Sequence, residues 1–109
     1  ALGVADFLRP SAHTTQQIGG VWAKHACERK VQLRADTVGT ATRLLERALH
    51  AHTASTIGNE AILCCRLALP PPQEVLVLLH CRVDKSVATV AVRSQSAATT
   101  DAVVSAIPH

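Results

Sequence analysis

Three aliphatic-rich runs follow one another in the second half of the chain, and no helical pattern separates them. They occupy residues 61–67, 74–83 and 87–93. Three prolines at 70–72 end the first run, because proline cannot continue a strand ladder, and a tight turn at 84–86 separates the other two. Short connections of this kind join strands that pair antiparallel. The sequence therefore predicts a sheet whose last three strands are consecutive.

Helical patterns alternate with strands in the rest of the chain. A short strand is expected at 4–8, a helix from Thr14, where Gln17 completes a capping box, a strand at 27–35, and a second helix capped by Asp36 or Thr37. Thr99 or Thr100 is expected to cap a last helix. The apolar stripe of the second helix consists of Val38, Ala41, Leu45, Ala48, Leu49 and His52.

The resulting order is β-α-β-α-β-β-β-α over a single domain, residues 1–109. It predicts an α+β fold with a mostly antiparallel sheet of about four to five strands and helices packed on it. Alternation at 27–35 directs Val31, Leu33 and Ala35 inward and leaves the intervening polar side chains in water. Those polar residues are Glu28, Lys30, Gln32 and Arg34. The first and second helices are expected to pack on the same face of the sheet.

Composition argues against several classes of function. The net charge is +3, and no aromatic residue lies among the basic ones, as it would in a nucleic-acid-binding surface. The four cysteines, Cys27, Cys64, Cys65 and Cys81, lack the paired spacing of a zinc site, so we expect four free thiols, no metal and no cofactor. No signal peptide or membrane-length apolar run occurs, so a soluble cytosolic protein without direct membrane insertion is expected.

No catalytic motif is present, and we expect no enzyme activity. Neighbouring residues on a strand point to opposite faces, so His80 cannot activate Cys81 as a nucleophile. His50 and His52, two residues apart on the expected second helix, cannot bind one metal ion together.

Trp22 has two interpretations. Only Trp22 and Phe7 are large aromatic residues in this chain, so Trp22 can be a core residue that holds the first helix on the sheet. Alternatively, Gly19, one helical turn earlier, leaves the indole uncovered and creates an apolar notch for an aromatic side chain of a peptide. The cost of two glycines in a helix, about 1 kcal/mol each, favours a local role for Gly19-Gly20.

Several segments resemble the platform subdomain of adaptin appendages, and in particular the C-terminal end of the ε subunits of adaptor protein complex 4. They are IGNEAILCC at 57–65, LLHCRV at 78–83 and VRS at 92–94, with FLRPS at 7–11 before a helix that carries a single tryptophan. The resemblance implies a sheet like that of the TATA-binding protein. It also implies a non-enzymatic module that recruits accessory proteins to vesicle coats at the trans-Golgi network through short aromatic-containing motifs.

The family's binding position maps here to Trp22, with His80, Arg82 and Thr89 from the sheet and Ile18 and Gly19 beside it. Gly19 replaces an aromatic residue of better-known platforms, so the preferred motif should differ. The resemblance implies the epsin-like protein tepsin as the accessory partner. It also implies contacts with other subunits of the complex through a preceding part of the chain and a peripheral position on trans-Golgi membranes. The alternative function is a nucleic-acid-binding α+β domain, because the fold type and the pI of about 8.9 permit it.

Overall fold

Strand-forming runs and two helices build the part of the chain described by a computed structural model, residues 27–68 and 74–108. The strands are β1 (Cys27–Arg34), β2 (His52–Ile57), β3 (Glu60–Ala68), β4 (Glu74–Asp84) and β5 (Val87–Ser94), and the helices are α3 (Val38–Leu49) and α4 (Ala97–Ala106). The strands form one antiparallel sheet in the order β1-β5-β4-β3-β2. The expected α+β fold is confirmed, and the predicted elements in this part follow the predicted order, with β2 added.

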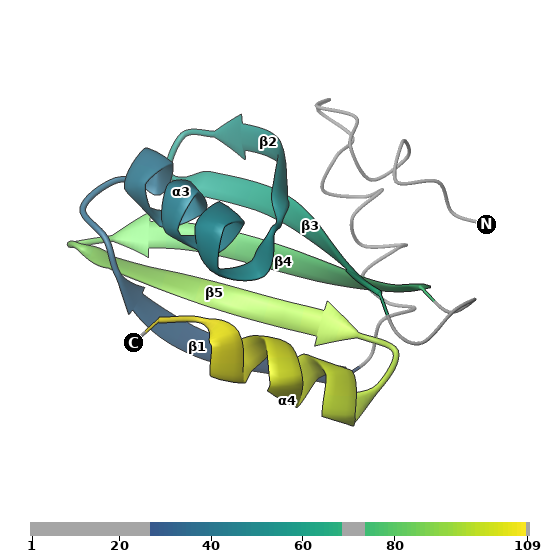
Figure 1. Cartoon of the computed structure of the whole chain (residues 1–109). Helices are drawn as coiled ribbons and strands as arrows, with labels where there is room; N and C mark the ends of the chain where they lie inside the picture. The colour runs from purple at the N-terminus through teal and green to yellow at the C-terminus, as the bar shows by residue number, and fades with distance from the viewer. Residues whose placement is uncertain (1–26, 69–73, 109) are drawn as a thin grey trace.

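Both helices cover the same face of the sheet, which we call the front face (Figure 1). α3 buries Ala41, Leu45 and Leu49 against it, and α4 buries Val103 and Val104. These side chains and the front-face residues of the strands form one apolar cluster in which Leu45, Leu63, Val77 and Leu79 have no exposed surface. Burial of this aliphatic surface is the main force that holds the two layers together.

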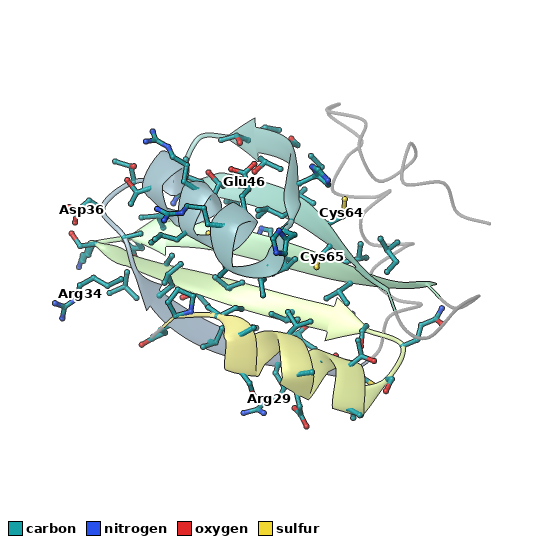
Figure 2. The ribbon with its side chains drawn as sticks, in the orientation of Figure 1. Arg29, Arg34, Asp36, Glu46, Cys64 and Cys65 are labelled. Atoms are coloured by element: carbon teal, nitrogen blue, oxygen red, sulfur yellow. The ribbon has the colours of Figure 1, made fainter. Side chains whose placement is uncertain are left out.

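The predicted alternation of β1 is confirmed. Leu33 and the following Ala35 are buried in the core cluster and Val31 is half-buried against it, while Lys30, Gln32 and Arg34 are exposed and Glu28 is half-buried. Figure 2 shows Arg34 at the end of the sheet. The period of two therefore gave the correct register of this strand. The predicted first strand, the first helix and the prolines at 70–72 lie outside the described residues.

The prediction that the second helix continues to His52 is wrong. α3 begins after Thr37, whose side-chain oxygen accepts a hydrogen bond from the Thr40 amide as predicted, but it ends at Leu49. His50 then adopts a left-handed conformation with φ 52° and turns the chain into β2. A left-handed residue is the common end of a helix. His52 consequently lies on a strand that the sequence did not predict.

The predicted cap of the last helix is also wrong, because Ser96 rather than Thr99 or Thr100 accepts the first-turn hydrogen bond. Thr100 is buried instead. Its hydroxyl donates to the carbonyl oxygen of Cys27 at 2.7 Å and lies 2.7 Å from the Ser94 hydroxyl. α4 is thus fixed to β1 and β5 by buried hydrogen bonds as well as by apolar contact.

Two hairpin turns set the register of β2 with β3 and of β4 with β5. Gly58 has φ +61° at the first central position of the β2–β3 turn, and Lys85 and Ser86 both have positive φ in the β4–β5 turn. Mirror-image turns of this kind match the twist of paired strands. The β2–β3 turn is anchored, since Asn59 donates its side-chain amide to the Val83 carbonyl and accepts from the Val83 amide, each at 2.9 Å.

No helix within the described ranges 27–68 and 74–108 is long and apolar enough to cross a membrane.

Candidate functional site

The sheet face that points away from α3 and α4, which we call the back face, carries the sheet residues predicted for the site. Directly paired residues of antiparallel strands share a face, so the register defines rows across the sheet. The first row is His52, Cys64, Leu78, Arg93 and Glu28; the second is Ser55, Ile62, His80, Ala91 and Lys30; the third is Ile57, Glu60, Arg82, Thr89 and Gln32.

Burial changes sharply across these rows. Leu78 and Cys64 in the first row are 0% and 4% exposed, and Ile62 and Ala91 in the second are 8% and 7% exposed. None of these four belongs to the core cluster of the front face. In the third row all five residues are exposed. A partner in solution can therefore reach the third row and part of His80, whereas the other central residues of the first two rows, Leu78, Cys64, Ile62 and Ala91, are closed to it.

His80, Arg82 and Thr89 meet at the border of the exposed region. Arg82 and Thr89 are directly paired across β4 and β5, and His80 lies two residues before Arg82 on the same face. The prediction that His80 and Arg82 share a strand face is confirmed, and Thr89 lies on the same face. Cys81 between them is fully buried on the front face, as the alternation predicted.

A contact between two side chains adds a residue that sequence reasoning did not select for the site. Oε1 of Glu60 lies 3.0 Å from Nε2 of His80, and both side chains are partly exposed. Glu60 is also directly paired with Arg82. The site therefore holds one carboxylate beside a histidine and an arginine, and it can offer a partner both hydrogen-bond donors and acceptors.

Ile57 closes the row at the edge of the sheet and was likewise not predicted as a site residue. It is 62% exposed and pairs with Glu60 across the β2–β3 hairpin. An exposed aliphatic side chain next to polar groups is a common feature of peptide-binding surfaces. The Gly58-Asn59 pair is a hairpin signal that could have placed Ile57 beside Glu60.

The remaining predicted site residues, Ile18, Gly19 and Trp22, lie outside the described residues. Two predictions about the first helix conflict: that it packs on the same sheet face as the second helix, and that its Trp22 lies beside His80 and Arg82. Packing beside α3 would place that helix on the front face, whereas His80 and Arg82 lie on the back face. Only one of these two predictions can hold.

The arrangement of the cysteines suits neither nucleophilic catalysis nor metal binding. Cys64 and Cys65 point to opposite faces of β3, as predicted, and the Cys65 thiol donates to the Leu49 carbonyl at 3.1 Å (Figure 2). Burial raises the pKa of the Cys81 thiol to about 11 and also raises the pKa of Cys65. Such thiols are poor nucleophiles. In the part of the chain that the structure describes, no three His, Cys, Asp or Glu residues gather as a metal site would require.

Comparison with known proteins identifies the family. The model of the family "Adaptin AP4 complex epsilon appendage platform" matches residues 10–109, nearly the whole chain. The chain belongs to this family. It is 32% identical over 97 residues to the human AP-4 complex subunit epsilon-1 and 30% identical over 104 residues to the mouse protein. These alignments cover 85% and 92% of the chain.

The chain spans only a small part of the length of these relatives, 8% of the human and 9% of the mouse subunit. No solved structure matches the chain. The fold agrees with the family expectation, since five antiparallel strands and two helices form the described part.

Proposed function

We propose that this platform is a non-enzymatic peptide-binding module of a vesicle-coat adaptor complex, and that it recruits accessory proteins through short aromatic-containing motifs. One observation carries the proposal. Three residues expected at a binding site from two different strands, His80, Arg82 and Thr89, lie together at the exposed end of one sheet face. We also propose that it works within a complex of the AP-4 type, in the cytoplasm and peripheral on trans-Golgi network membranes; membership of the family supports this placement. Other parts of the subunit would contact the remaining subunits.

The buried half of the back face supports a position for Trp22. Leu78, Cys64 and Ile62 are buried on a face that neither α3 nor α4 covers. We propose that the segment before β1 packs there, because β1 begins at Cys27, one residue from the first row. Trp22 would then lie near His80, with Ile18 and Gly19 forming the notch for the aromatic side chain of the motif.

The charges of the site agree with peptide binding better than with nucleic-acid binding. Glu60 and Asp84 lie on the same face as Arg82 and Arg34, so the exposed surface carries both signs. A nucleic acid requires a continuous basic surface. A short motif needs only an apolar anchor and a few hydrogen bonds, and it typically binds with a Kd in the micromolar range, about −8 kcal/mol.

The proposal is tested by NMR titration of the ¹⁵N-labelled chain with the disordered tail of an accessory protein such as tepsin. We expect amide shifts at 80–82 and 89 and in the segment before β1. Arg82→Glu should weaken binding about tenfold or more. Arg43→Glu is the matched control, because Arg43 is an exposed arginine on α3, which covers the opposite face.

Two further variants test the notch. Gly19→Leu should fill it and abolish binding while the chain stays folded, whereas Trp22→Ser should lose binding and also stability if the indole is partly in the core. Equal binding by Arg82→Glu, Gly19→Leu and the parent chain would place the motif elsewhere. Binding to an arbitrary oligonucleotide that weakens steeply with salt would favour the nucleic-acid alternative.

A further inference from the structure

Ile57 is a large aliphatic residue whose side chain stays in water in the part of the chain that the structure describes. It is 62% exposed, whereas Ile62 and Ile107, the other isoleucines described, are 8% and 1% exposed. Single exposed aliphatic residues are common on protein surfaces, so exposure alone assigns no role to Ile57. A role has to follow from its neighbours on the sheet.

The third row of the back face places Ile57 in line with the proposed binding site. Arg82 is directly paired with Glu60, and Glu60 with Ile57, so the three side chains share one face of β4, β3 and β2. All three are exposed. Neighbouring strands lie about 4.8 Å apart, so Ile57 is about 10 Å from Arg82 along the row.

His80, beside which the aromatic side chain of the motif is proposed to bind, lies two residues before Arg82 on the same face. A path from His80 to Ile57 crosses two strand spacings and runs two residues along the sheet, which amounts to about 12 Å. An extended peptide spans this distance with about three to four residues. A short motif is therefore long enough to reach both positions.

The β2–β3 hairpin holds Ile57 in a fixed position relative to Arg82. Asn59, in the turn after Ile57, donates its side-chain amide to the Val83 carbonyl, and its own carbonyl oxygen accepts from the Val83 amide, each at 2.9 Å. Val83 follows Arg82 on β4, so these bonds tie the turn to the strand that carries the arginine. A contact surface on fixed backbone loses little entropy when a partner binds.

The polar groups between His80 and Ile57 suit the backbone of a peptide that crosses the strands. Within the described part of the chain, no hydrogen bond or ion pair involves the Arg82 guanidinium, which can donate to a peptide carbonyl. Oε1 of Glu60 lies against His80, and Oε2 can accept from a peptide amide. Neither contact requires a charged residue in the partner.

We propose that Ile57 determines the specificity of the back-face site, an inference that rests on the proposed function. It contacts an aliphatic side chain of the bound motif, about three to four residues from the aromatic one. The carboxylate of Glu60 beside Ile57 disfavours an acidic residue at that position, and contact between two aliphatic side chains removes both from water.

The first measurement is the titration with the tepsin tail, repeated with variants of Ile57. Ile57→Ser should weaken binding about fivefold or more, because the apolar contact is lost. Ile57→Leu keeps an aliphatic side chain of similar volume and should bind within about twofold of the parent.

Val87→Ser is the matched control and should also stay within about twofold of the parent. Val87 is an exposed aliphatic residue on the same face, but it lies on β5, on the other side of β4 from Ile57. Circular dichroism checks that all three variants fold.

The second measurement locates the partner side chain and needs no change to the core of the chain. Synthetic peptides of the tail carry serine in place of each aliphatic residue within about five positions of an aromatic one. One of these replacements, about three to four residues from the aromatic residue, should weaken binding to the parent about fivefold or more but leave binding to Ile57→Ser within about twofold.

The inference and the proposed function fail in different ways. If the parent does not bind the tail, or Arg82→Glu binds it equally well, the proposed function is wrong and the role of Ile57 is lost with it. If Arg82→Glu weakens binding but Ile57→Ser has no more effect than Val87→Ser, only the inference about Ile57 is wrong. The same holds if no peptide replacement depends on Ile57.

Two further results would assign Ile57 to another contact and overturn the inference. Tighter binding of a peptide with lysine at the aliphatic position, lost in Glu60→Gln, would show that the row selects a basic residue. Concentration-dependent dimerisation in light scattering that Ile57→Ser abolishes would show that Ile57 contacts a second copy of the chain.

Discussion

Two glycines of this platform should respond to the same substitution with opposite signs. Gly58 has φ +61° in the β2–β3 turn, a conformation that costs an L-residue about 1–2 kcal/mol. A Cβ there would meet no atom within 4 Å, so the cost is backbone strain alone. Alanine also lowers the entropy of the unfolded chain, which returns about 0.4–1 kcal/mol. We expect Gly58→Ala to lower the free energy of unfolding by about 1 kcal/mol.

Gly39 lies in the first turn of α3, where its backbone is helical. A Cβ there would lie 3.8 Å from Oγ1 of Thr37, an ordinary contact that leaves the cap intact. Because alanine has the higher helix propensity, Gly39→Ala should raise the free energy of unfolding by about 0.5–1 kcal/mol.

Urea unfolding followed by circular dichroism measures both changes. The two variants should differ by about 1.5–2 kcal/mol, and their separate elements should make the double variant close to the sum. A rise in both variants would refute the reasoning about Gly58, because it would show that the turn does not require its left-handed conformation. A fall in both would refute the reasoning about Gly39.

Two other changes test the buried polar and sulfur groups. Thr100→Val removes the buried hydroxyl that bonds Ser94 and Cys27 and should lower the free energy of unfolding by about 1–3 kcal/mol in the same urea assay. Thr99→Val is its control. The Thr99 hydroxyl makes no such bond, so this variant should change the free energy of unfolding by less than about 0.5 kcal/mol. The raised pKa of Cys81 means that the unfolded thiol, at its ordinary value of 9.0, loses its proton first. The stability due to this thiol is therefore complete below pH 9 and declines up to about pH 11, so the deficit of Cys81→Ala relative to the parent should be smaller at pH 10.5 than at pH 8.

The sequence predicted the strands that show either a period of two or an unbroken apolar run. In β1 and β4 the side chains alternate between the front-face core and the back face, so a period of two reveals both the strand and its register. This is why Leu33, Cys81 and His80 were placed correctly. The same period grouped His80 with Arg82 without any knowledge of which strands are neighbours.

β2 could not be predicted in this way. Residues 53–56 are small and mostly polar, and His52 continues the helical stripe three residues after Leu49, so the pattern of α3 hides the start of the strand. The signal that ends α3 is a histidine with positive φ, whereas glycine or asparagine is the usual sign of that conformation. The cap of α4 was misplaced for a related reason. Ser96, Thr99 and Thr100 are all capping residues, and only tertiary packing shows that Thr100 is needed in the core.

The missed strand is also the reason why Ile57 and Glu60 were not assigned to the site. Their position next to Arg82 depends on the pairing of β2 with β3 and of β3 with β4, which is tertiary information. Ile57 lies at the end of the exposed third row, on the edge strand β2. A peptide bound at Arg82 would therefore find a carboxylate and then an exposed aliphatic side chain on the two neighbouring strands. The pairing of three strands, and no single segment of the sequence, brings these polar and apolar contacts into one row.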